Sequence, residues 1–190
     1  MKSFTLDTNC LIDIDEDRPA AAHIRALLEA GASGKADLAL VASSASERQK
    51  GGTFLANISE FKERQNSLGF GSLPLLPSIA RADMSFFDKS LYGWSEGTAR
   101  EGLIFNLLFP SSSFEWADYA AAKGVDSKDH GTGAYLRWRN MILDAQALWA
   151  HDHAGRAVFV TSDVRLKIIN DHPEFPAMNV RTPEEAADLL

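Results

Sequence analysis

The chain has 190 residues, of which 45% are hydrophobic and 24% are charged, a composition typical of an ordinary globular domain. Its formal net charge of −7 argues against a surface that attracts nucleic acid over its whole extent, but not against a local basic patch. The single cysteine, Cys10, cannot form an internal disulfide, which favours the reducing cytoplasm. Neither a secretory signal nor an apolar run of ~20 residues is present. We therefore expect one cytoplasmic domain, spanning residues 1–190, with no membrane partner.

Hydrophobic runs and helical periodicities alternate along most of the chain. Strands that alternate with helices predict an α/β fold with a central parallel sheet and right-handed crossovers. In chain order, the predicted elements are a strand at 3–6, helices at 10–14 and 19–31, a strand at 37–41, helices at 57–68, 79–92, 98–109, 114–123 and 131–155, a strand at 157–161, helical turns at 164–170, a strand at 178–180 and a last helix after the capping box at 182–185.

The region from about 69 to 124 has a different texture. Pro74, Pro77 and Pro110 interrupt it, and three serines at 111–113 mark a loop. We interpret it as a helical insertion or lid on a single domain. Its apolar run at 103–109 predicts either a core helix or a contact in a homodimer.

An acidic residue follows each of three predicted strands, and a fourth lies on the helix that precedes the last of them. Asp7 and Asp163 come directly after strands, and Glu47 follows the second strand. Asp144 lies about nine residues before the end of its helix, which is ~14 Å along the helix axis. The following strand runs in the opposite direction for ~20 Å, so its carboxyl end, at Asp163, returns to the level of Asp144. The carboxyl ends of parallel strands form the ligand-binding edge of such sheets. We therefore expect these four acids to converge there.

A cluster of carboxylates without a cation would repel itself. A Mg²⁺ or Mn²⁺ ion would remove that repulsion and activate a water for attack on a phosphodiester. Asn9, Thr161 and Ser162 add neutral groups that can orient ligands or the water. Arg137 and Arg165 flank the acids, and we interpret them as RNA phosphate contacts, with ordinary surface charges as the alternative.

Each acid also has a simpler interpretation. Asp7 and Asp163 can be plain helix caps, Glu47 can be solvated in its polar loop, and Asp144 can be solvated or locally paired. Glu60 is the rival to Glu47 as the fourth acid; we prefer Glu47 because it follows a strand. The run 151–153, His-Asp-His, places its histidines on different helix faces, so we interpret it as a solvated helix end.

The order and spacing of these segments resemble the PIN domain, a family of metal-dependent nucleases. The matching residues are Leu6-Asp7-Thr8-Asn9-Cys10-Leu11-Ile12, Asp144 with the helix to Gly155, and the strand 158–160 with Thr161-Ser162-Asp163; the segment 41–47 matches the one that carries the family's acid. The resemblance implies a three-layer α/β/α sandwich, bound Mg²⁺ or Mn²⁺, and cleavage of single-stranded RNA. Many small bacterial members are toxins held by an antitoxin, and many dimerise, but the 69–124 region is longer than compact toxin-like members need.

The sequence hypothesis is therefore a Mg²⁺- or Mn²⁺-dependent endoribonuclease. Asp7, Asp144 and Asp163 would ligate the metal directly or through water, and Glu47 would be the fourth catalytic acid. The partners are single-stranded RNA, with a homodimer and an antitoxin as the family's further implications. The alternative is a non-catalytic PIN-like binding or regulatory module, which the net charge of −7 weakly favours.

Overall fold

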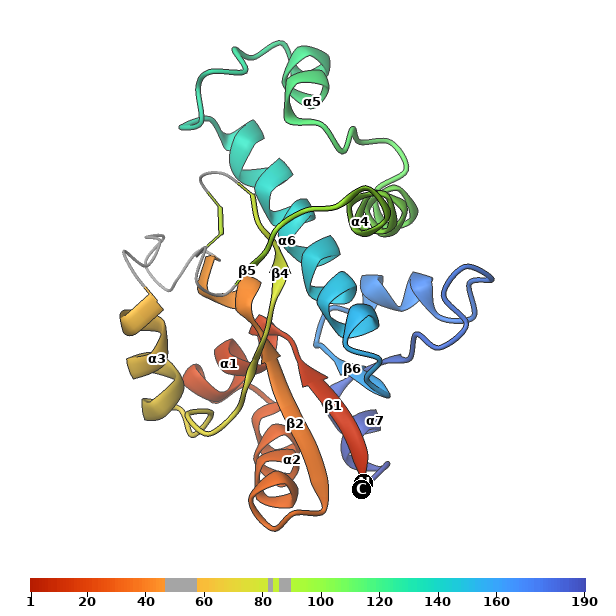
Figure 1. Cartoon of the computed structure of the whole chain (residues 1–190). Helices are drawn as coiled ribbons and strands as arrows, with labels where there is room; N and C mark the ends of the chain where they lie inside the picture. The colour runs from red at the N-terminus through yellow and green to blue at the C-terminus, as the bar shows by residue number, and fades with distance from the viewer. Residues whose placement is uncertain (47–57, 82–83, 86–89) are drawn as a thin grey trace.

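A five-stranded parallel sheet forms the centre of the computed structural model, which describes residues 1–46, 58–81, 84–85 and 90–190 (Figure 1). The strand order is β3-β2-β1-β6-β7, and in the central register Leu6 lies opposite Leu40 on one side and Val160 on the other. Helices flank the sheet on both faces. This confirms the predicted α/β class and is consistent with a three-layer sandwich. The strands are β1 (Lys2–Leu6), β2 (Ala36–Val41), β3 (Leu75–Leu76), β6 (Val158–Val160) and β7 (Val180–Arg181).

Side chains on alternate strand positions enter two separate cores, as the twofold period of a strand requires. Phe4, Leu6 and Leu40 pack with helices on one face, whereas Phe159 and Val41 pack with helices on the other. Each fully buried side chain of this size contributes about 1.5–3 kcal/mol. The helices of the first face are α1 (Thr8–Asp15), α2 (Ala21–Ala32), α3 (Ile58–Ser67) and α7 (Pro183–Ala187).

Helix α6 (Gly133–His153) covers the second face and is the longest helix of the described residues, about 31 Å at 1.5 Å per residue. Thr132 caps it by accepting a hydrogen bond from the backbone N–H of Tyr135. Its buried side includes Trp138, Ile142 and Leu148, which agrees with the helix predicted at 131–155. In Figure 1, α6 runs diagonally past the carboxyl ends of β1 and β6, so it carries side chains to that edge of the sheet.

The region 69–124 is more varied than predicted. β3 belongs to the central sheet, and β4 (Ser78–Ile79) pairs in parallel with β5 (Ser90–Leu91), so the helix predicted at 79–92 is wrong at both ends. Ser78 and Ile79 instead pair with Ser90 and Leu91, a contact between residues distant in sequence that helical periodicity does not reveal. The helices α4 (Ser95–Leu108) and α5 (Trp116–Lys123) follow, and both pack against α6.

The apolar run at 103–109 is mainly a core helix. Ile104 and Phe105 are fully buried, while Leu103 is 38% exposed. Two short 3-10 helices continue strands at the carboxyl edge of the sheet: η1 (Ala42–Ser46) after β2 and η3 (Val164–Ile169) after β6. In the parts of the chain that the structure describes, no helix has both the length and the apolar character needed to cross a membrane.

Candidate functional site

A cavity of about 200 Å³ opens at the carboxyl edge of the sheet. Asp7 reaches it from the end of β1, Asp144 from α6 and Asp163 from the end of β6, so the fold brings together three of the predicted acids. Glu47 lies outside the described residues. Its rival Glu60 is exposed on α3 and does not line the cavity. The described lining consists of Asp7, Asn9, Asn140, Leu143, Asp144, Asp163 and Arg165.

Asp7 is held rigidly because it is the N-cap of α1. One carboxylate oxygen accepts from the backbone N–H of Thr8 at 2.8 Å. The other accepts from the Thr161 hydroxyl at 2.7 Å and from the Asn9 amide nitrogen at 3.0 Å. Burial raises the pKa of Asp7, and these donors oppose the rise by stabilising the charged form. The predicted supporting residues Asn9 and Thr161 therefore act on Asp7 directly.

Asp163 is compensated by a neighbour on its own turn. It is the N-cap of η3 and accepts from the backbone N–H of Arg165 at 3.0 Å. The Arg165 guanidinium also contacts both carboxylate oxygens, with Nε at 2.9 and 3.1 Å and Nη2 bonded to Oδ2. These hydrogen bonds lower the pKa of Asp163. Arg165, predicted as an RNA contact, is thus paired within the chain, although its side chain is 80% exposed.

Asp144 has the opposite environment. Within the described residues its carboxylate makes no hydrogen bond or ion pair, although it is only partly exposed and lines the cavity. Burial is the main cause that raises its pKa to about 8, and the charges of Asp7 and Asp163 raise it further. The cavity therefore contains one acid that has no hydrogen-bond or ion-pair partner among the residues that the structure describes.

Ser162 does not line the cavity, contrary to its predicted supporting role. Its hydroxyl donates to the carboxylate of Asp13 in the last turn of α1. Asp13 is only 2% exposed and also forms an ion pair with Arg18, 3.5 Å away. Thr161 and Ser162 are thus bonded to opposite ends of one helix, which fixes the loop that carries Asp163. Asp13 thus supports this loop from the buried side of α1 and does not itself line the cavity.

The two arginines before Asp144 have different surroundings. At 100° per residue, Arg137 lies about 20° around the helix from Asp144 and Arg139 about 140°. Arg137 is exposed, in line with Asn140 on the cavity rim, whereas Arg139 is 9% exposed. Arg137 does not itself line the cavity. It therefore suits a contact with a long ligand that extends past the rim.

The interpretation of residues 151–153 as a solvated helix end is wrong for His151. This side chain is 1% exposed, and its Nδ1 lies 2.8 Å from the Thr5 hydroxyl of β1. Burial lowers its pKa to about 4, so it is neutral near pH 7. Asp152 pairs with Arg100. His151 joins α6 to the sheet, which is a role in the fold.

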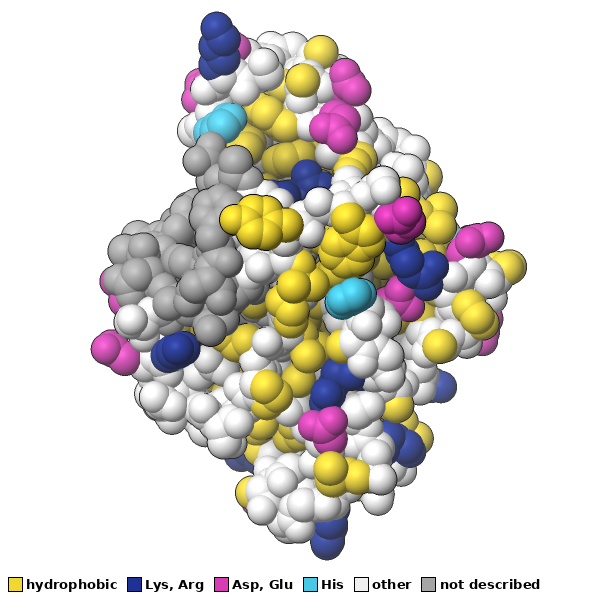
Figure 2. All heavy atoms as spheres, viewed as in Figure 1, with side chains coloured by type: hydrophobic (Ala, Val, Ile, Leu, Met, Phe, Trp, Pro, Cys, Tyr) yellow, Lys and Arg dark blue, Asp and Glu magenta, His cyan; other side chains and the backbone are white. Residues whose placement is uncertain are grey.

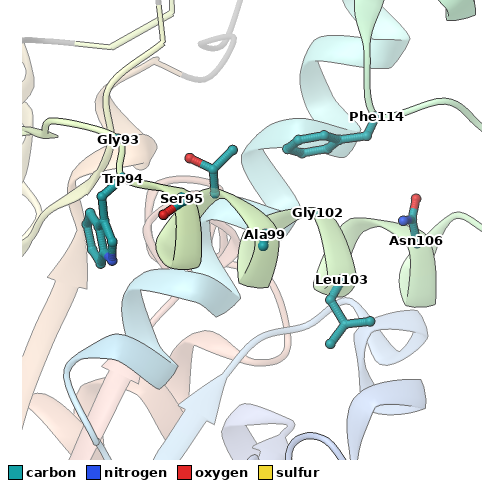
Figure 3. A pocket seen from close by; sticks show the side chains of 9 residues that line it. Gly93, Trp94, Ser95, Ala99, Gly102, Leu103, Asn106 and Phe114 are labelled. Carbon is teal, nitrogen blue, oxygen red and sulfur yellow. The ribbon is translucent and has the colours of Figure 1, made fainter.

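A second, larger hollow of about 670 Å³ runs along α4 (Figure 3). Figure 3 shows Trp94 at one end, Phe114 across the helix, and Ala99 and Leu103 along it. Figure 2 shows hydrophobic side chains gathered over this part of the molecule, where Tyr92 and Trp94 are exposed. The described residues that line this hollow include no acid and none of the predicted site residues, whereas three of the predicted acids line the cavity at the carboxyl edge of the sheet.

The cavity's donor set suits a hard cation. Carboxylate and amide oxygens from Asp7, Asp144, Asp163 and Asn9 are the ligands that Mg²⁺ and Mn²⁺ prefer, and both ions keep bound waters. Yet among the described residues no three histidine, cysteine or acidic side chains are already grouped to hold an ion. The carboxylate of Asp163 contacts the Arg165 guanidinium instead. No family model, curated protein or solved structure matches the chain.

Proposed function

We propose that this chain is a PIN-like endoribonuclease that uses Mg²⁺ or Mn²⁺ at the Asp7–Asp144–Asp163 cavity to cleave single-stranded RNA. One observation carries the proposal: Asp144, with a pKa of about 8 and no partner among the described residues, lines a cavity with two other carboxylates. A divalent cation would stabilise all three charges together. The resemblance to PIN domains supplies the reaction.

The chain's own residues would divide the work. Asp7 is fixed by three donors and Asp163 by its backbone cap, so both are preorganised, while Asp144 would lose its proton as the cation arrives. When bound, the cation would act as a Lewis acid that activates water and stabilises charge on the phosphate. The exposed Arg137 would contact the RNA backbone beyond the rim. Glu47 stays a prediction as the fourth acid.

A second function, a non-catalytic binding or regulatory module, has one specific observation in its favour. Asp163 is already neutralised by Arg165, and both Asp7 and Asp163 serve as helix caps, which was their simpler interpretation. Such a protein would bind its partner without needing the cation. The toxin role, an antitoxin, a homodimer and a cytoplasmic location stay predictions from the sequence.

Labelled single-stranded RNA incubated with Mn²⁺ separates these two functions. The nuclease should cut it internally, stop when EDTA is added, and lose the activity in Asp7→Asn, which keeps the shape of the side chain. A preparation in which Asp7→Asn cuts as fast as the wild type would reveal a contaminating nuclease. RNA left intact by the wild type at millimolar Mn²⁺ would favour the non-catalytic module.

A further inference from the structure

We infer that Arg165 is a built-in counter-ion of the metal cavity: it occupies Asp163 until a divalent cation displaces it, and it then contacts the phosphate of the bound RNA. The inference rests on the proposed function, because it needs the cation site. It goes beyond that function by giving one residue two successive partners, and by making cation binding a condition for full RNA binding.

The first support is the position of the guanidinium. Its Nε and Nη2 contact both oxygens of Asp163, and Arg165 is one of the residues that line the cavity. A cation that ligates Asp163 would compete for the same oxygens. Arg165 also lowers the energy of the charged Asp144, so its charge acts on the acid that would gain most from the cation.

The second support is that the contact can be released without loosening the loop. Asp163 stays capped through the backbone N–H of Arg165 at 3.0 Å, and its own N–H donates to the Thr161 hydroxyl at 3.0 Å. The Arg165 side chain is 80% exposed and that of Asp163 17% exposed, and an ion pair that one solvent-exposed side chain holds contributes little to stability. The guanidinium can therefore leave Asp163 at small cost while the acid keeps its place.

The third support is the chemistry of the released group. A guanidinium offers several N–H donors in a planar fork that matches two phosphate oxygens. After displacement it would be tethered two residues from Asp163, at the mouth of a cavity where a phosphate must arrive for cleavage. The chain is acidic overall, with a net charge of −7, and therefore repels RNA. The positive charge of the released Arg165 guanidinium would offset part of that repulsion beside the site.

Calorimetric titration of Mn²⁺ into the wild type, Arg165→Gln and Lys167→Gln tests the competition. Lys167 is the matched control: it lies on the same 3-10 helix, but its ammonium pairs with Glu185 at 2.7 and 2.8 Å. Arg165→Gln should bind Mn²⁺ about two- to fivefold more tightly than the wild type, and Lys167→Gln should match the wild type. If Arg165→Gln binds Mn²⁺ while the wild type and Lys167→Gln do not, the inference would be supported most strongly.

The contrary outcomes point to different errors. If the wild type binds Mn²⁺ and Arg165→Gln binds it equally or more weakly, the inference fails and the metal site stands. Equal tightening in both variants would show a general charge effect and would also overturn it. If neither the wild type nor Arg165→Gln binds Mn²⁺, the proposed function fails and takes the inference with it.

The second partner is tested by stopped-flow fluorescence anisotropy, which follows RNA binding before cleavage. Mn²⁺ should strengthen binding of a labelled single-stranded RNA more in the wild type than in Arg165→Gln, because only the wild type gains a freed guanidinium. The same gain from Mn²⁺ in both proteins would remove the phosphate contact from the account.

Discussion

Asp163 and Asp144 line the same cavity but differ in how their charges are balanced. Asp163 is capped by a backbone N–H and held by the Arg165 guanidinium, so its pKa is lowered. Asp144 has neither kind of partner among the described residues, and its pKa rises to about 8. The difference shows where a cation would act: it would exchange one partner at Asp163, but it would supply the missing one at Asp144.

The largest expected effect comes from Asp144→Asn. The change keeps the shape of the side chain but removes a charge that the cation needs, so metal-dependent RNA cleavage should fall by about a hundredfold or more. Asp163→Asn should cause a similar loss. In EDTA at pH 8 the two variants should separate: Asp144→Asn should unfold at a higher urea concentration than the wild type, and Asp163→Asn at a lower one, because only the latter breaks an ion pair.

Glu60→Gln is the control for these variants, since Glu60 is an exposed acid on α3 outside the cavity lining. It should leave both cleavage and stability near those of the wild type. If Asp144→Asn cleaves RNA as fast as the wild type, Asp144 has no part in the reaction.

A smaller effect is expected in the pH dependence of stability. The folded protein holds a proton on Asp144 up to about pH 8, whereas an unfolded Asp loses it near 3.8. Unfolding therefore releases a proton between these values, and this group makes the protein less stable as the pH rises from about 4 to 8. In Asp144→Asn that decline should be reduced by on the order of 1 kcal/mol, since the partly exposed site is screened by solvent.

Urea unfolding of the wild type and Asp144→Asn in EDTA at pH 5 and pH 8 measures this effect. His151 works in the opposite direction, because its lowered pKa makes the protein less stable as the pH falls below about 6.5. Both proteins contain His151, so its contribution cancels in the comparison. Equal pH dependence in the two proteins would mean that Asp144 is not the uncompensated acid.

The smallest effect is expected for Arg137, which is exposed outside the cavity that Asp144 and Asp163 line. Arg137→Ala should weaken binding of single-stranded RNA about threefold and reduce the slope of log affinity against log salt by about 0.7, as expected for one lost phosphate contact. Arg25→Ala is the control, because Arg25 is exposed on α2 and pairs with Asp17. Affinity across a salt series measures both. Equal slopes for the two variants would place the RNA elsewhere.

Much of the fold could be predicted because burial patterns repeat along the sequence. The apolar strand 3–6 and the periodic helix 131–155 correspond to β1 and α6. β1 is buried on both sides, and α6 is buried along one side in its first half and all round at residues 145–151. The stretch 75–91 could not be predicted, because its strands are two residues long. At that length a strand has no period to detect, and only partners distant in sequence, such as β2 for β3, specify it.

The sequence predicts those residues of the candidate site whose position follows from the end of a strand. It does not predict residues whose role depends on the direction in which the side chain points. Asp7 and Asp163 follow strands, so the edge of a parallel sheet brings them together. Ser162 is adjacent to Asp163, yet it faces Asp13 because consecutive residues of the turn point different ways. His151 looked solvated because it is near a helix end, but the end of α6 crosses β1 and buries it against Thr5.

The most direct test of the account is anomalous diffraction from crystals soaked in Mn²⁺. A manganese peak should appear in the cavity that Asp7, Asp144 and Asp163 line, with the Arg165 guanidinium turned away from Asp163. A peak with Arg165 still on Asp163 would keep the metal site and remove the competition. Crystals soaked at millimolar Mn²⁺ that show no peak in this cavity would contradict the central claim.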